Sequence, residues 1–197
     1  MTEANQLDQI AQHVTEILRL LGLDAEADAQ LRRTPQRVAQ LCLELFQAVG
    51  QPPPDIGLIE NPIQRTALTS DEMILVRDLP FYSLCIHHLL PFFGRAHIAY
   101  VPRAKMAGFG GLARLLRHLA SQPQLQERMT NAVADHLQAA LEPEGIIVHV
   151  QARHLCLEMR GERVTHFVET TAARGVFQTG RLRDEFFAWI KSEGVKG

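Results

Sequence analysis

Hydrophobic residues near the start of the chain recur every three or four positions, as they do in amphipathic helices. Apolar side chains follow this spacing from Leu7 to Leu21, and Gly22 is well suited to end the helix. A second helix is predicted to begin with Thr34 as its N-cap and Pro35 as its first helical residue. A run of prolines from residue 52 then forms a stiff connector. We therefore predict a helical region over residues 1–50 and a separate domain over residues 51–197.

The rest of the chain alternates between the two-residue period of strands and the longer period of helices. The predicted strands are Met73–Leu79, Phe92–Val101, Gly145–Met159 and Val164–Val176. The predicted helices are Leu112–Leu119, Leu125–Leu141 and Arg181–Ile190, with a loop at Gly108–Gly111. This ββ, αα, ββ, α order is typical of an α+β fold that has antiparallel strand pairs and helices on one face.

Composition narrows the class of protein. The chain has 197 residues, of which 46% are hydrophobic, and its apolar stretches are too short to span a bilayer. Acidic residues among the first twenty argue against a signal peptide. A net charge of −2 argues against a nucleic-acid partner, and 3 cysteines are too few for a disulfide framework. We therefore expect a cytoplasmic protein with no membrane partner, and its 9 histidines invite a search for a site.

The segment between the first two predicted strands combines a cysteine and a histidine at metal-ligand spacing. Cys85 and His88 are three residues apart, so a tight turn brings both side chains to a common point. Thiolate and imidazole ligands together favour zinc. Of the other two thiols, Cys42 lies in an apolar helical stripe, whereas Cys156 shares a strand face with His154. Three protein ligands would leave a fourth position open, as in catalytic zinc sites. A chance Cys-x-x-His match and a half-buried sheet histidine are the alternative interpretations.

Four segments together resemble the successive signatures of the GTP cyclohydrolase I family. They occur in the family's order and at about its spacings, and the resemblance extends from Leu7 to Phe187. The segments are Arg33–Ala39, Phe81–Gly94, Gln122–Arg128 and His154–Gly161. The resemblance implies the tunnelling fold and a ring-shaped homodecamer. It also implies zinc-dependent hydrolysis of GTP to 7,8-dihydroneopterin triphosphate and formate.

The same resemblance assigns roles to individual residues of this chain. It implies that the zinc ligands are Cys85, His88 and Cys156. It implies that His87 and His154 are catalytic, and that Glu127 binds the guanine edge with Gln126 beside it. It implies that the triphosphate is held by Arg37, Arg114 and Arg160.

The residue chemistry agrees with these implied roles. Zinc lowers the pKa of bound water toward about 7, which supplies a nucleophile for opening an imidazole ring. Histidines such as His87 and His154 are suited to exchange protons with purine and ribose atoms, because the pKa of histidine lies near neutral pH. A buried carboxylate such as that of Glu127 could accept two N–H bonds from guanine.

The chain departs from the family pattern mainly where the family binds phosphate. Ile86 replaces a glutamate, Gly110 and Gly111 replace a Ser-Lys pair, and Gln40 replaces a lysine. Three interpretations stay open: a GTP cyclohydrolase that binds phosphate differently, a related zinc hydrolase of a purine or pterin with fewer phosphates, or a non-catalytic binding subunit. The backbone at Gly110 and Gly111 could serve as an anion nest. We expect a lysine placed at Gly111 to shift preference toward GTP.

Overall fold

The computed structural model describes residues 3–24, 27–61, 72–161 and 163–191. The chain forms two compact units, Met1–Val49 and Gly50–Gly197, and each is described by itself.

The first unit contains two helices, α1 (Glu3–Leu20) and α2 (Thr34–Leu45). Gly22 has a φ of 80°, and the N–H of Leu23 donates to the carbonyl of Leu18 at 2.9 Å, so α1 ends at a glycine as predicted. The prediction that Thr34 is the N-cap of α2 is wrong by one residue, because Arg33 holds that position. The N–H of Thr34 already donates to the carbonyl of Leu31 at 2.8 Å, so the chain enters the helical conformation before Thr34.

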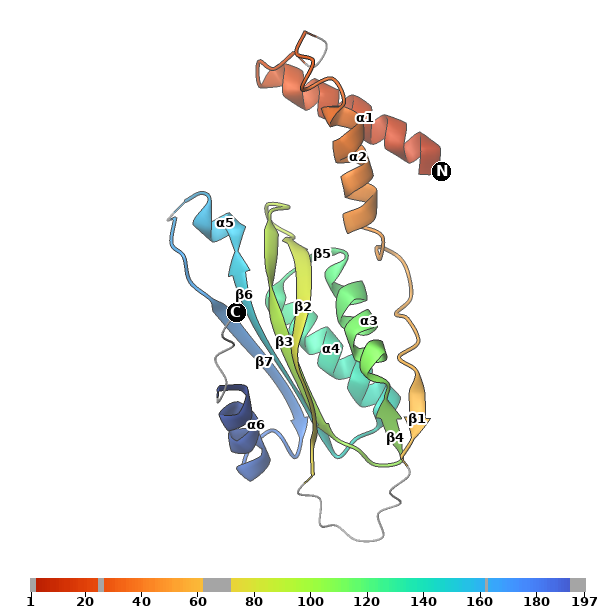
Figure 1. Ribbon diagram of the computed structural model, residues 1–197, viewed down its shortest axis with the longest axis vertical. Helices are drawn as coiled ribbons and strands as arrows, with labels where there is room; N and C mark the ends of the chain where they lie inside the picture. Colours follow the sequence, from red (N-terminus) through yellow and green to blue (C-terminus); the bar gives the residue numbers. More distant parts are fainter. Residues whose placement is uncertain (1–2, 25–26, 62–71, 162, 192–197) are drawn as a thin grey trace. The chain divides into compact units, whose positions relative to one another are not determined.

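The second unit is built on a five-stranded sheet with strand order β5-β2-β3-β6-β7 (Figure 1). Neighbouring strands are antiparallel, except that β5 pairs with β2 in parallel. The strands are β2 (Ile74–Cys85), β3 (Pro91–Val101), β5 (Pro123–Gln124), β6 (Gly145–His154) and β7 (Val168–Gly175). The helices are α3 (Phe109–Ala120), α4 (Gln126–Leu141), α5 (Leu155–Glu158) and α6 (Arg181–Lys191). A separate short pair joins β1 (Leu58–Glu60) to β4 (Lys105–Ala107).

The two faces of the sheet bury different sets of side chains. Alternate residues of β3 and β6, such as Ile98 and Val148, pack in one core with the buried leucines of α3 and α4. The intervening residues, such as Ala99 and Ile147, pack on the other face with Phe186 of α6. Figure 1 shows α3 to the right of the strands, α4 behind them, and α6 at the lower left beside β7. The predicted α+β class with antiparallel strand pairs is confirmed, and α6 adds a small second core.

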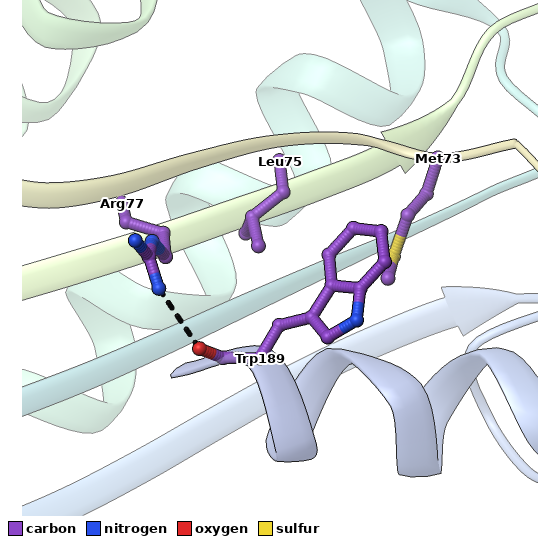
Figure 2. Close-up of a pocket in the computed structure, with 4 residues that line it drawn as sticks. All are labelled: Met73, Leu75, Arg77 and Trp189. Atoms are coloured by element: carbon purple, nitrogen blue, oxygen red, sulfur yellow. Dashed lines mark hydrogen bonds between the residues drawn. The ribbon is translucent and has the colours of Figure 1, made fainter. Parts of the chain in front are cut away.

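A hollow beside α6 shows how this last helix is attached to the sheet. Met73, Leu75, Arg77 and Trp189 line the hollow (Figure 2). The guanidinium of Arg77 donates from Nη1 to the carbonyl oxygen of Trp189 at 2.9 Å. Carbonyls in the last turn of a helix lack partners within the helix, so this contact from β2 satisfies one of them. No helix in the described ranges is both long and apolar enough to cross a bilayer.

Four predicted boundaries are corrected by the structure. Strand β2 continues past Leu79 to Cys85, and Pro80 keeps its register opposite Arg95 of β3 although it has no N–H to donate. Strand β6 stops at His154, and Val164–Val176 is a strand only from Val168. The predicted loop at Gly108–Gly111 is largely helical, because α3 begins at Phe109.

Candidate metal centre and catalytic site

The tight turn between β2 and β3 brings two of the predicted ligands together. Cys85 is the last residue of β2, and its carbonyl accepts the N–H groups of His88 at 3.3 Å and Leu89 at 2.8 Å. The N–H of Cys85 donates to the carbonyl of Leu90 at 2.9 Å, which closes the hairpin. Leu89 takes up the reversal with a φ of 52°. The predicted tight turn is therefore present, with Cys85 buried and His88 exposed.

Cys156 reaches the same place from a short helix. The prediction that it lies in a strand is wrong, because the chain leaves β6 after His154 and Cys156 lies in the four-residue helix α5. The ligand atoms of Cys85, His88 and Cys156 all lie within 4.8 Å of one another. Among the described residues, no other group of three histidine, cysteine or acidic side chains meets this criterion. The sequence-predicted trio therefore converges in space.

An ion pair that the sequence analysis did not single out fixes α5 to β6. The guanidinium of Arg153 donates from Nε to Oε1 of Glu158 at 2.9 Å, and its Nη2 donates to Oε2 of the same carboxylate. This contact holds the pKa of Glu158 below its ordinary value. The side chain of Glu158 is only 9% exposed, so the pair is shielded from solvent on one side. Arg153 lies just before α5 and Glu158 is the last residue of α5, so the ion pair holds the helical turn that carries Cys156. In the sequence, this ion pair is indicated only by two opposite charges, five residues apart, on either side of Cys156.

The donor set suits a transition metal such as zinc. Burial, and then the neighbouring thiol of Cys85, raise the pKa of Cys156 above its ordinary value. The thiol of Cys156 therefore resists ionisation until a cation compensates its charge. The guanidinium of Arg160 lies 3.0 Å from Nε2 of His88. Since a guanidinium can only donate, Nε2 of His88 is the acceptor, and its lone pair would have to leave Arg160 to bind a metal ion.

The two predicted catalytic histidines are close to these ligands in the sequence: His87 lies between Cys85 and His88, and His154 lies two residues before Cys156. His87 is exposed in the hairpin turn, with Nδ1 3.9 Å from Sγ of Cys85. His154 is half-buried at the end of β6, and its ring stacks on Phe92 with centroids 4.8 Å apart and planes 7° apart. Burial lowers the pKa of His154, while the negative charge of Glu127 acts in the opposite direction. His154 is thus a neutral, rigidly held imidazole next to the ligand helix.

The two residues at the start of α4 have opposite environments. Glu127 is exposed in the first helical turn, which corrects the expectation of a buried carboxylate. The positive end of the helix dipole favours a carboxylate at this position. Gln126 is 1% exposed and its amide hydrogen-bonds inside the protein, to residues of β6 and β7 and to His154. Only Glu127 therefore presents its side chain to solvent.

The predicted phosphate residues lie in three different parts of the chain. Arg114 is exposed on α3, and its Nη2 donates to the carbonyl of Asp55 at 3.2 Å. Arg160 contacts His88 as described above. Arg37 is exposed on α2 in the first unit, where it helps to line a hollow. The residues that line this hollow are Arg32, Arg33, Gln36, Arg37 and Gln40.

Gly111 has a structural reason to be glycine. A Cβ atom at this position would lie 1.7 Å from the carbonyl oxygen of Ile56 and 2.5 Å from its carbon. A lysine at Gly111 would therefore have to displace this backbone, and the expectation that it shifts preference toward GTP stays a prediction. The N–H of Gly111 donates to the carbonyl of Gly108 at 2.8 Å, so it is engaged in the helix rather than in an anion nest.

These features define an α+β protein with a candidate metal centre of two thiols and one imidazole at the end of a β-hairpin. The chain belongs to the GTP cyclohydrolase I family, whose profile matches residues 10–191. This membership agrees with the tunnelling fold that the sequence resemblance implied.

Three relatives show how far the similarity extends. The GTP cyclohydrolase 1 of Geobacillus kaustophilus (strain HTA426) is 44% identical over 191 residues, covering 93% of this chain and 96% of its own. That of Streptococcus suis (strain 05ZYH33) is 42% identical and covers 94% and 98%. That of Bacillus cytotoxicus is 41% identical and covers 95% and 97%. Among solved structures, the archaeosine synthase QueF-Like in the apo form aligns with a TM-score of 0.45 and 17% identity over 54% of this chain and 97% of its own, too distant to carry an argument.

Proposed function

We propose that this protein is a zinc-dependent GTP cyclohydrolase I. It hydrolyses the guanine imidazole ring of GTP and gives 7,8-dihydroneopterin triphosphate and formate. The observation that carries the proposal is the convergence of Cys85, His88 and Cys156 within 4.8 Å in a chain of this family. Relatives named GTP cyclohydrolase 1 that match more than nine-tenths of the chain support the same activity.

Cys85, His88 and Cys156 are the residues that would hold the zinc ion. Thiolate and imidazole match its preference for sulfur and nitrogen, and three protein ligands leave one position open. When bound, the ion would supply Lewis-acid activation of water at neutral pH. Arg153 and Glu158 support this arrangement, because their ion pair holds the helix that carries Cys156.

The remaining roles fall to exposed or rigidly held side chains around the group. His87, in the exposed turn, exchanges a proton with the substrate, and His154 does so from its fixed position against Phe92. Glu127 accepts N–H bonds from the guanine edge, for which its exposure in the first turn of α4 suits it. Arg114, Arg160 and Arg37 bind the triphosphate.

The phosphate contacts set the expected substrate preference. Gly111 and Gln40 lack the cations that the family resemblance implies at these positions. A charge-assisted contact to phosphate contributes about 1.5–3 kcal/mol, so two fewer contacts weaken triphosphate preference by about two to four decades. We therefore expect GTP to be only slightly preferred over GDP, GMP or guanosine. Inorganic triphosphate that competes as tightly as GTP would contradict this expectation.

We also propose a ring-shaped homodecamer that acts in the cytoplasm. Strand β7 pairs with β6 alone among the described residues, so one edge of the sheet is available for a neighbouring subunit. The three cysteines are free thiols, which suits a reducing compartment. Light scattering at micromolar concentration tests the assembly, and a monomer would contradict it.

Formate release from GTP and the zinc content of the purified chain test the enzymatic proposal together. We expect about one zinc ion per chain and formate in step with the pterin product. Cys156→Ser should lose most of the zinc and the activity. Cys42→Ser is the matched control, because this half-buried thiol lies on α2 and outside the ligand group. Unchanged zinc in Cys156→Ser, or no formate from GTP by the zinc-loaded protein, would overturn the proposal.

A further inference from the structure

The buried side chain of Gln126 makes four hydrogen bonds with a consistent direction. Its Nε2 donates to the backbone carbonyls of Val150 at 3.2 Å and Val168 at 2.9 Å. The same nitrogen lies 3.1 Å from Oγ1 of Thr170. Its Oε1 lies 2.7 Å from Nε2 of His154. Strands β6 and β7 and helix α4 thus meet at one amide.

The neighbouring threonines show that the amide cannot be reversed. Oγ1 of Thr130 donates its hydrogen to the backbone carbonyl of Gln126 at 2.8 Å. In the 2.7 Å contact between the two hydroxyls, Thr170 must therefore be the donor to Thr130. This leaves Oγ1 of Thr170 as an acceptor for Gln126. A reversed amide would point its oxygen at two carbonyls that can only accept, leaving buried acceptors without donors.

The amide orientation in turn determines the hydrogen position on His154. Oε1 of Gln126 can only accept, so Nε2 of His154 must carry a hydrogen. The neutral ring then has its lone pair on Nδ1. Stacking on Phe92 holds the plane of the same ring. Both the plane and the hydrogen of His154 are therefore set by groups that do not exchange protons.

We propose that Gln126 is a positioning residue, which fixes His154 in the tautomer with hydrogen on Nε2 and leaves Nδ1 as the nitrogen that meets the substrate. This inference rests on the proposed function, because it assigns His154 a role in turnover. It replaces the expectation that the Gln126 side chain binds guanine, since that amide is engaged within the protein. The guanine edge is then left to Glu127.

The test compares Gln126→Met with a control in the zinc-loaded, full-length protein. Methionine keeps the length of the side chain but removes the acceptor for His154. Thr170→Val is the control, because it removes one bond to the same amide and leaves the His154 contact. Solid-state NMR of ¹⁵N-histidine-labelled protein reports the tautomer, and His154→Asn identifies its signals among those of the 9 histidines. Zinc content, kcat and KM for GTP are measured in parallel.

We expect wild type and Thr170→Val to show His154 with hydrogen on Nε2, and Gln126→Met to show a mixture of tautomers. Gln126→Met should keep its zinc and its KM and lose about 10- to 100-fold in kcat, less than the 10²–10⁴ of a general acid–base group itself. Combined with His154→Asn, it should cost no further activity, because the two residues act as a unit.

Three outcomes would overturn this inference. They are hydrogen on Nδ1 of His154 in the wild type, a raised KM with unchanged kcat in Gln126→Met, or losses that multiply in the double variant. The NMR result does not depend on the substrate. A protein that releases no formate from GTP but shows the Nε2 tautomer would therefore reject the proposed function and leave the positioning of His154 intact.

Discussion

Replacing Gly111 by alanine tests the close packing of the segment around Ile56 against the start of α3. The new Cβ would lie 1.7 Å from the Ile56 carbonyl oxygen and 2.8 Å from its Cα, well inside van der Waals contact. The segment would have to move outward. That movement strains two contacts, the bond from Gly108 N–H to the Gly57 carbonyl at 3.0 Å and the bond from Arg114 to the Asp55 carbonyl at 3.2 Å.

The net effect is a loss of stability. Overpacking costs about 1–3 kcal/mol, and each weakened hydrogen bond about 0.5–1.5 kcal/mol. Alanine offsets about 0.5–1 kcal/mol of this, because it favours the helix over glycine. We expect a net loss of about 1–5 kcal/mol, which corresponds to a fall in Tm of about 2–20 °C for a chain of this length.

Gly110→Ala is the matched control, one position earlier in the same helix. Its Cβ would meet only the mobile end of Arg114, with Nη1 at 3.3 Å, so we expect unchanged or slightly raised stability. Thermal unfolding and urea denaturation of both variants decide the matter. Equal Tm values for the two variants would refute the packing argument, and the packing around Ile56 would then not explain the glycine at position 111. If the argument holds, Gly110 is the position at which a lysine can be added without moving the backbone.

Three further predictions follow from the site and the sheet. His87→Ala and His154→Ala should keep zinc and lose about 10²–10⁴-fold in turnover, measured as formate release, and zinc loss in His87→Ala would make His87 a ligand. Glu158→Gln should release zinc to a chelator up to about tenfold more readily, because α5 loses its ion pair to β6, and an unchanged release rate would exclude this role. Burial lowers the pKa of His149, so its unfolded form binds more protons as pH falls. Its contribution to stability is full above about pH 6.5 and is lost as pH falls through the folded pKa, so His149→Gln should flatten the decline in Tm between pH 8 and pH 5, and a parallel decline would contradict it.

Local spacing predicted the parts of the site that are close in sequence. Cys85 and His88 lie in one turn, so their convergence depends on little beyond the hairpin. The end of β6 was not predictable in the same way. Alternating residues continue from Val148 through Cys156, so the pattern is the same whether the chain stays in the strand or enters α5. The pairing of Arg153 with Glu158, which holds that helical turn, is visible only in three dimensions.

Gly111 shows a second limit of sequence reasoning. From the sequence alone, a glycine in place of an expected lysine indicates only that a phosphate contact is missing. The carbonyl of Ile56, more than fifty residues earlier, is what excludes a side chain there. The sequence also could not predict that Gln126 is buried and Glu127 exposed. Both are at the start of the same helix, and their burial depends on which neighbouring elements cover them.

The separation of Cys156 from the hairpin ligands has a consequence for how the protein matures. Cys85 and His88 can meet as soon as β2 and β3 pair, and two ligands hold an ion weakly. The third arrives only after β6 aligns with β3 so that Phe92 faces His154. A slip of one residue in that alignment would turn the end of β6 to the opposite face and leave the ion with two ligands. If the proposed ion binds here, only chains whose central strands are in the correct register would retain it, so metal content would report correct strand pairing.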